Sequence, residues 1–218
     1  MEVALIANGE FIELTFRLSE NKNSTRRSIL GVAFLCKENI DSYFCKHKKR
    51  NVMKRIFLIG YMGCGKTTTG KRIAKKYGLQ FVDLDQYIEK RFFKSITQIF
   101  AEKGEDEFRK TERKMLEEVA NFENVVISTG GGAACFFDNI DFMNKCGETV
   151  YLKGSAEALF EYLRNASQDR PLLKDKSPEE MLQFIKENLG KREPFYAKAK
   201  HTIDSRDMSD TLFDQICK

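Results

Sequence analysis

The stretch GYMGCGKTTTG, Gly60–Gly70, constrains the fold of this chain more than any other. It follows the apolar run Arg55–Ile59, which has the length of a strand, and it precedes a segment with helical character. Glycines at a junction between a strand and a helix let the backbone approach a ligand closely. We therefore expect a ligand-binding loop carried by an α/β scaffold.

Within this stretch, Gly60, Gly65, Lys66 and Thr67 fit the phosphate-loop pattern G-x-x-x-x-G-K-[ST]. In such a loop the backbone N–H groups point inward around a phosphate, and the following helix adds its N-terminal dipole. Lys66 would place a charge on the β- and γ-phosphates, and the Thr67 hydroxyl could ligate Mg²⁺. The alternative is a glycine-rich turn that binds nothing, but a chance match is on the order of one in a hundred for a chain of this length. The motif predicts a nucleoside triphosphate and does not name the acceptor.

Composition limits the other functions that the chain could have. Its 218 residues suffice for one domain with a sizeable core. No apolar run approaches the ~20 residues that cross a bilayer, so we expect no membrane partner. The N-terminus lacks the basic start of a secretory signal and the six cysteines are scattered, so we expect reduced thiols in a cytoplasmic protein. A zinc site at Cys36, Cys45 and His47 would lack a fourth ligand nearby.

The net charge of +5 is modest for a protein that binds nucleic acid. The basic cluster Lys46–Arg50 has the composition of a solvated linker, and only some clusters of this kind bind a phosphate backbone. We therefore expect no nucleic-acid partner.

Strand-like and helix-like segments alternate from Lys54 onward, which indicates an α/β fold with a mostly parallel sheet. The preceding residues do not join this alternation, although Phe11–Leu18 alternates at period two and could form a strand. The expected strands are Ile56–Ile59, Phe81–Val82, Val125–Ser128, Thr149–Leu152 and Thr202–Ile203, and the expected helices are Lys66–Tyr77, Gln86–Phe93, Ile96–Glu102, Glu105–Phe122, Ala156–Asn165, Pro178–Leu189 and Lys191–Ala199.

Two carboxylates close the second expected strand. Asp83 and Asp85 stand at its carboxyl end, where α/β sheets bind ligands. They could divide the work, one lying near a metal and the other accepting a hydroxyl proton. An aspartate that only caps a helix is an equally good interpretation.

Three further stretches bear on the acceptor. Arg109, in GEDEFRKTE, could hold a carboxylate with two parallel hydrogen bonds, although a solvated surface arginine is the default in so charged a helix. Gly130–Gly132 follow a buried-looking strand and exceed what a plain turn requires. Arg170 lies in QDRPLL between two expected helices, where a basic loop can close over phosphates as a lid.

Together these stretches resemble the shikimate kinase family. The motifs GYMGCGKTT, DLD, GEDEFR, STGGG, RPLL and KREPFY occur in the family's order and spacing, over about residues 54 to 204. The resemblance implies ATP-dependent phosphorylation of the 3-hydroxyl of shikimate, on the pathway to chorismate and the aromatic amino acids. It also implies a three-layer, nucleoside-monophosphate-kinase-like fold of the P-loop class with a five-stranded parallel sheet. The substrate-binding region would span about residues 84–112 and the lid about residues 165–177.

The resemblance also implies roles for single residues. Lys66, Asp85 and Arg170 would be catalytic, with Asp85 as the candidate base and Arg170 as the lid arginine. Thr67 and Asp83 would serve Mg²⁺, and Glu112 would hold the arginines in place. Because phosphoryl transfer needs mostly positioning, Asp85 must only orient the hydroxyl and take its proton late, and it needs no strongly raised pKa. The implied ATP-binding residues are Gly63, Cys64, Gly65, Lys66, Thr67, Thr68 and Arg170, and the implied shikimate-binding residues are Asp85, Phe100, Phe108, Arg109, Gly130, Gly131, Gly132 and Arg192.

Two features depart from the family pattern. Cys64 stands where a small residue such as serine is usual. Near Lys66 and a helix N-terminus its thiol could have a lowered pKa and react with iodoacetamide, or it could be an inert residue chosen for size. Residues 1–52 precede the family's usual start, so we expect that Met53 is the true start or that these residues are dispensable. The alternative is an added element that covers a sheet edge.

Three rival functions remain to be weighed. A gluconate kinase would share the phosphate loop and the lid, but it would not need two arginines and three glycines aimed at a cyclic carboxylate. A nucleic-acid-associated nucleotide switch is disfavoured by the near-balanced charge of residues 54–218. An inactive kinase-like regulator is disfavoured by the intact Lys66, Asp85 and Arg109. We expect a monomer whose partners are ATP and shikimate and whose metal is Mg²⁺.

Overall fold

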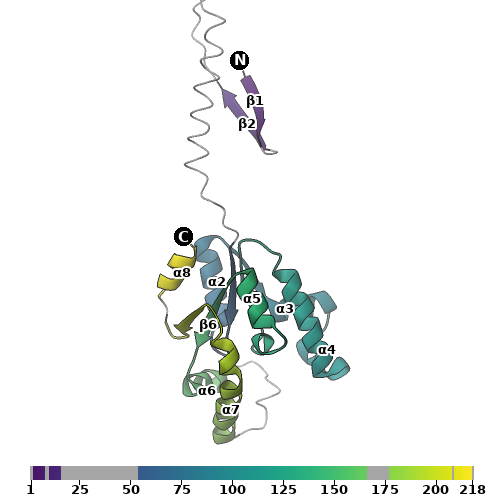
Figure 1. Cartoon of the computed structure of the whole chain (residues 1–218), viewed down its shortest axis with the longest axis vertical. Helices are drawn as coiled ribbons and strands as arrows, with labels where there is room; N and C mark the ends of the chain where they lie inside the picture. The colour runs from purple at the N-terminus through teal and green to yellow at the C-terminus, as the bar shows by residue number, and fades with distance from the viewer. Residues whose placement is uncertain (1, 8–9, 16–53, 166–176, 208, 218) are drawn as a thin grey trace, which may run out of the picture. The chain divides into compact units, whose positions relative to one another are not determined.

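The computed structural model describes residues 2–7, 10–15, 54–165, 177–207 and 209–217 (Figure 1). The chain divides into two units, Met1–Val52 and Met53–Lys218. In the first unit, β1 (Glu2–Ala7) and β2 (Glu10–Thr15) pair as antiparallel strands. β2 overlaps the strand expected at Phe11–Leu18, whereas β1 was not expected.

The second unit is built on a parallel sheet of five strands, as expected, with the order β4-β5-β3-β6-β7. The residues Ile56, Phe57, Leu58 and Ile59 of the central strand are fully buried. A strand that is covered on both faces has an almost continuous apolar sequence, and for this reason the run RIFLI predicted the central strand correctly. The strands are β3 (Arg55–Ile59), β4 (Gln80–Asp83), β5 (Val125–Ser128), β6 (Glu148–Lys153) and β7 (His201–Asp204).

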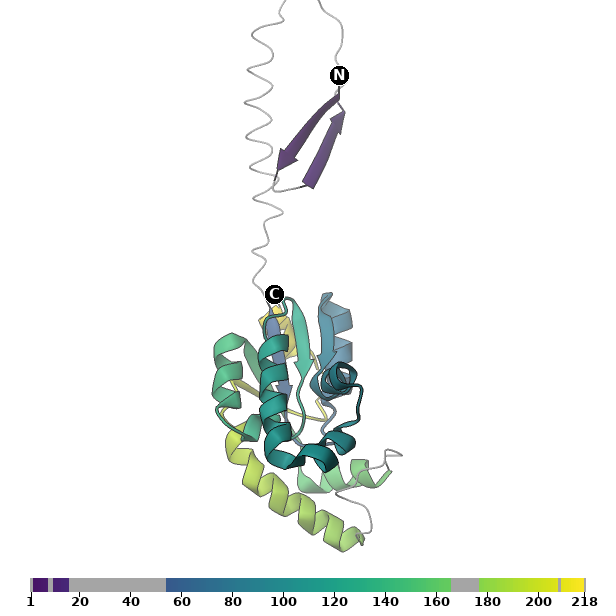
Figure 2. The same cartoon turned by 90° about the vertical axis from the view of Figure 1, so that its right-hand side faces the viewer.

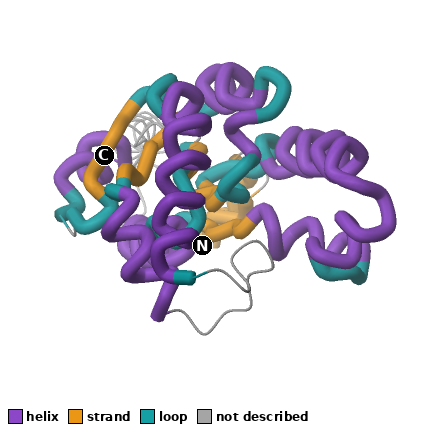
Figure 3. Tube along the Cα trace, turned by 90° about the horizontal axis from the view of Figure 1, so that it is seen from below, coloured by secondary structure: helices purple, strands orange, loops and turns teal. Residues whose placement is uncertain are grey.

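Helices surround this sheet (Figure 3), and the three-layer α/β architecture is confirmed. α7 lies against α6 at the lower end of the unit in Figure 2. The helices are α2 (Lys66–Tyr77), α3 (Leu84–Phe92), α4 (Ile96–Val119), α5 (Asn139–Cys146), α6 (Ala156–Asn165), α7 (Pro178–Tyr196) and α8 (Thr211–Cys217), with the short 3-10 helix η1 at Ala133–Cys135.

A glycine interrupts α4, whereas α7 continues through its glycine. The break expected near Gly104 is present, since this residue has φ 76° and ψ 174° inside α4. The break expected at Gly190 is absent, and α7 runs unbroken to Tyr196 with Pro194 inside it. α3 begins two residues earlier than expected, because the Asp83 side chain accepts a hydrogen bond from the Gln86 backbone N–H at 3.4 Å. The short elements η1, α5 and α8 were not expected.

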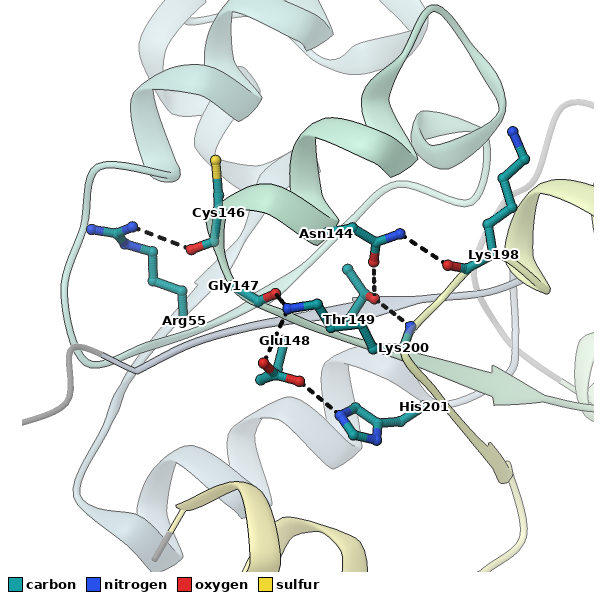
Figure 4. A network of polar contacts seen from close by, with 9 residues as sticks. All are labelled: Arg55, Asn144, Cys146, Gly147, Glu148, Thr149, Lys198, Lys200 and His201. Carbon is teal, nitrogen blue, oxygen red and sulfur yellow. Dashed lines mark hydrogen bonds and ion pairs between the residues drawn. The ribbon is translucent and has the colours of Figure 1, made fainter.

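Polar contacts lie around the amino-terminal ends of β3, β6 and β7 (Figure 4). The Glu148 carboxylate, at the start of β6, accepts from Lys200 Nζ at 3.1 Å and lies 2.7 Å from His201 Nε2. The Thr149 hydroxyl accepts from the Lys200 backbone N–H at 2.8 Å. No residue expected in the functional site belongs to this network, so its contribution is to hold β6 and β7 in register.

Candidate active site

A pocket of about 710 Å³ lies at the carboxyl ends of β3, β4 and β5. It gathers nearly every residue that the sequence singled out. Cys64 does not line it, and Arg170 lies outside the described residues, as do residues 166–176 of the expected lid. The lining residues are Met62, Gly63, Gly65, Lys66, Thr67, Thr68, Asp83, Asp85, Gln86, Glu89, Ile96, Phe100, Phe108, Arg109, Glu112, Ser128, Thr129, Gly130, Gly131, Gly132, Tyr162 and Arg192.

The phosphate loop connects β3 to α2. Gly65 caps α2 with φ 85°, a left-handed conformation that suits glycine, and no side chain caps the helix. The first N–H groups of α2 are therefore free to bind an anion, and the helix dipole favours one. At Gly60, with φ 139°, a Cβ would lie 2.8 Å from the Leu152 carbonyl oxygen, so only glycine fits at the start of the loop.

Lys66 is held against the loop that precedes it. Its side chain is buried, and Nζ donates to the carbonyl oxygens of Gly60 at 2.9 Å and Tyr61 at 2.8 Å. The Cys64 sulfur lies 3.6 Å from Nζ, and Cys64 is only 3% exposed. The thiol is therefore packed behind the loop, which supports the interpretation of Cys64 as an inert residue chosen for its size.

Thr67 and Asp83 form one hydrogen-bonded pair, in which Thr67 Oγ1 donates to Asp83 Oδ2 at 2.8 Å. Asp83 also caps α3, so the capping interpretation of this aspartate is confirmed, while its role near a metal stays a prediction. A hydroxyl and a carboxylate side by side are hard oxygen ligands of the kind that Mg²⁺ prefers. No group of three or more His, Cys, Asp or Glu residues in the described part of the chain could hold a metal ion. The donor set thus fits a Mg²⁺ ion that takes its other ligands from phosphate and water.

Asp85 lies on the wall of the pocket among other acidic groups. Burial, and next the negative charges of Glu112 and Asp83, raise its pKa to about 6, while the positive charge of Lys66 opposes the shift. The mechanism expected from the sequence did not need a strongly raised pKa, but the fold produces one. Sequence reasoning missed the shift because Glu112 approaches Asp85 only in the folded chain.

Arg109 is a buried residue, 9% exposed, and not the solvated surface arginine that its charged helix suggested. Nη1 donates to Glu112 Oε2 at 2.7 Å, and Nη2 donates to Glu105 Oε1 at 3.1 Å. The guanidinium also lies 4.1 Å from the centre of the Phe136 ring, which sequence reasoning had not singled out. These contacts fix the plane of the guanidinium at the pocket wall.

Glu112 links the two arginines of the pocket. It is 1% exposed, and burial raises its pKa while the charges of Arg109 and Arg192 lower it. The Arg192 guanidinium lies over the Tyr61 ring, 5.5 Å from its centre. The pocket therefore holds two guanidinium groups around one buried carboxylate, and these groups are the donors that it offers to an anionic ligand on this side.

The three glycines after β5 make room for these charged groups. A Cβ at Gly130 would lie 2.7 Å from Asp85 Oδ1, and a Cβ at Gly132 would lie 2.9 Å from Arg109 Nη2. Nearby, the rings of Phe100 and Phe108 pack with their centres 4.3 Å apart and supply an apolar wall. The cavity can thus accept a compact ligand that has a charged group and an apolar ring face.

A phosphate loop that opens into this pocket, on a five-stranded parallel sheet, defines a P-loop kinase of small molecules. The family model described as shikimate kinase matches residues 62–218. The chain belongs to the shikimate kinase family. The gluconate kinase, nucleic-acid-associated and inactive alternatives are not favoured.

Relatives and solved structures agree with this assignment. The shikimate kinase of Phocaeicola vulgatus is 58% identical over 158 residues, which cover 72% of this chain and 90% of the relative. That of Parabacteroides distasonis is 60% identical over 156 residues, 72% of this chain and 90% of the relative. The crystal structure of the Bacteroides thetaiotaomicron shikimate kinase is 50% identical with a TM-score of 0.70, covering 76% of this chain and 95% of that one. The Acinetobacter baumannii enzyme in complex with shikimate is 33% identical with a TM-score of 0.67, covering 76% and 94%.

Proposed function

We propose that this chain transfers the γ-phosphoryl group of ATP to the 3-hydroxyl of shikimate and that the residues of the pocket divide this work between them. One observation carries the proposal. The phosphate loop and a pair of arginines on one buried glutamate line the same pocket, with Asp85 on its wall. A phosphate donor and an anionic acceptor can therefore be held together in one pocket.

On the nucleotide side, the N–H groups of Gly63–Thr68 bind the β- and γ-phosphates. Lys66 leaves the two loop carbonyls and pairs with the phosphate oxygens. Thr67 and Asp83 would hold Mg²⁺, which when bound would supply charge neutralisation at the transferring phosphoryl group. Arg170, on the predicted lid, adds positive charge to the transferring phosphoryl group.

On the acceptor side, Arg109 and Arg192 clamp the shikimate carboxylate. A planar guanidinium can donate two parallel hydrogen bonds to a carboxylate, which fixes the orientation of the ring as well as its position. Gly131 and Gly132 let the carboxylate lie close to the backbone, and Phe100 and Phe108 line the apolar face of the ring. Most of the barrier is lowered in this way, by positioning two reactants that would otherwise meet in solution.

Asp85 orients the 3-hydroxyl and accepts its proton as the new P–O bond forms. A pKa of about 6 leaves this carboxylate mostly ionised at neutral pH, yet it is a stronger base than an exposed aspartate would be. The acidic surroundings that raise the pKa thus favour the proton transfer.

The proposal includes a monomeric enzyme of the cytoplasm that needs neither nucleic acid nor a membrane. Cys64, Cys135, Cys146 and Cys217 are free thiols, which supports a reducing compartment. In the described part of the chain, no helix has the length and apolar character needed to cross a membrane.

A coupled ADP-release assay tests the function. We expect turnover with shikimate as the only acceptor, dependence on Mg²⁺, and a product whose mass exceeds that of shikimate by one phosphoryl group. Gluconate at the same concentration should give only the background rate. Turnover with gluconate and none with shikimate would refute the proposal.

A further inference from the structure

Tyr196, near the end of α7, is a buried residue whose polar atom points at the active-site loop. It is fully buried, and its hydroxyl donates to the Gly131 carbonyl oxygen at 2.5 Å. Gly131 lines the pocket, whereas Tyr196 does not. The phenol thus lies behind the pocket wall and ties α7 to the loop that follows β5.

The same tyrosine lies beside one arm of the arginine pair. Arg192 precedes Tyr196 by four residues on α7, so the two side chains share one helix face. Burial raises the pKa of Tyr196, and the charge and side-chain contact of Arg192 lower it, which places the guanidinium next to the phenol. Arg192 Nη1 would also lie 3.8 Å from a Cβ at Gly131. The Tyr196 hydroxyl therefore bonds to the glycine loop at Gly131, the residue beside which Arg192 also lies.

A neighbouring tyrosine shows that this hydrogen bond is a specific feature. Tyr151, on β6, packs its ring against Tyr196 with the centres 5.1 Å apart. Tyr151 is 2% exposed, and its hydroxyl has no hydrogen-bond partner in the structure as described. Of two stacked, buried phenols, only that of Tyr196 is joined to the pocket wall.

We propose that Tyr196 is a positioning residue for shikimate, whose hydroxyl fixes the Gly131 carbonyl and the Arg192 guanidinium relative to each other. It acts through these two groups and does not touch the substrate. The inference rests on the proposed function and deepens it, because it adds a residue that determines how the carboxylate is held. Gly131 lies near the Met62 backbone of the phosphate loop and Arg192 lies over Tyr61, but both groups that the hydroxyl positions belong to the acceptor side, so the larger effect is expected on shikimate.

The test compares Tyr196→Phe with Tyr151→Phe, since each variant loses one buried hydroxyl and keeps its ring. Shikimate is titrated at saturating MgATP, ATP is titrated at saturating shikimate, and shikimate binding without nucleotide is measured by calorimetry. For Tyr196→Phe we expect kcat/KM for shikimate to fall about tenfold, with KM for ATP changed less than twofold. Tyr151→Phe should stay within twofold of the wild type in both titrations.

A double-mutant cycle separates positioning from a merely structural role. If Tyr196 acts through Arg192, then Tyr196→Phe should weaken shikimate binding by less than threefold in an Arg192→Lys background, because the positioned fork is already lost. Equal losses in the two backgrounds would overturn the inference. Equal losses of kcat/KM for shikimate and for ATP would also overturn it. Failure of Tyr196→Phe to fold, while Tyr151→Phe folds, would overturn it as well. Either result would show that the hydrogen bond contributes only to the stability of the fold. A wild-type protein without activity on shikimate would instead refute the proposed function.

Discussion

Neutralising Asp85 should abolish activity and at the same time stabilise the fold. Its pKa is raised from 3.8 to about 6, mainly by burial and then by Glu112 and Asp83. A group whose pKa is raised by folding binds more protons in the folded state than in the unfolded state. Between pH 4 and pH 6 this carboxyl group therefore lowers the stability of the wild-type fold as the pH rises. The amide side chain in the variant Asp85→Asn cannot ionise and would remove this loss, so this variant tests the electrostatics of the pocket.

The magnitude follows from the shift itself. The pKa difference of about 2.2 between the folded and unfolded states lowers the free energy of unfolding by roughly 3 kcal/mol at pH 8, where the carboxylate is ionised in both states. At pH 4.5 the carboxyl group of the folded protein is almost fully protonated, and the same calculation gives a loss of about 1 kcal/mol in the free energy of unfolding. The stability difference between Asp85→Asn and wild type should therefore grow by up to ~2 kcal/mol from pH 4.5 to pH 8. Asp85 is partly open to the pocket, so these figures are upper bounds.

Urea denaturation of both proteins at the two pH values measures this difference. The comparison across pH cancels any effect of the amide group that does not depend on protons. Asp106→Asn, which removes an exposed carboxylate from α4, provides the baseline for a general change in charge. Asp85→Asn should also lower kcat by about 10²-fold or more through loss of the base. An equal difference at pH 4.5 and pH 8 would refute the reasoning, because folding would then not be linked to a proton at this position.

Four other outcomes are expected. Arg109→Lys keeps the charge and loses the fork, so kcat/KM for shikimate should fall on the order of 100-fold while KM for ATP changes much less; equal losses for the two substrates would contradict its place in the clamp. Gly132→Ala should raise KM for shikimate about tenfold with little change in melting temperature, because its Cβ would displace the Arg109 guanidinium; an unchanged KM would show that the guanidinium can give way. Cys64 should react with iodoacetamide far more slowly in the native protein than in urea, as peptide mass mapping would reveal, and fast native labelling would show that the loop opens. A chain that starts at Met53 should keep kcat/KM within about threefold and its melting temperature within a few degrees, whereas its collapse would show that residues 1–52 belong to the fold.

Local sequence determined the elements whose pattern depends only on nearby residues. The central strand was predicted correctly because it is apolar along its whole length, and the phosphate loop because its glycines and Lys66 have a fixed spacing. The order of motifs then indicated the family, and with it the five-stranded sheet. These features need no knowledge of which segments meet in space.

Helix continuity, in contrast, was decided by packing. Ile99 and Phe108 are both buried, yet in one regular helix they would face directions about 180° apart, so the chain turns at Gly104 to bury both. In α7, Ile185 and Tyr196 fall within about 20° of each other, so a single apolar stripe runs past Gly190 and the helix continues. A glycine alone does not tell the two cases apart.

The chemistry of the pocket belongs to the tertiary structure for the same reason. The charged sequence of its helix predicts that Arg109 is exposed. In the fold it is buried, because Phe136 from another segment of the chain packs against its guanidinium. The raised pKa of Asp85 depends on the carboxylate of Glu112, and the contact of Tyr196 with Gly131 joins residues 65 positions apart. Sequence identifies which groups are available, but burial and electrostatic coupling depend on distances that only the folded chain sets.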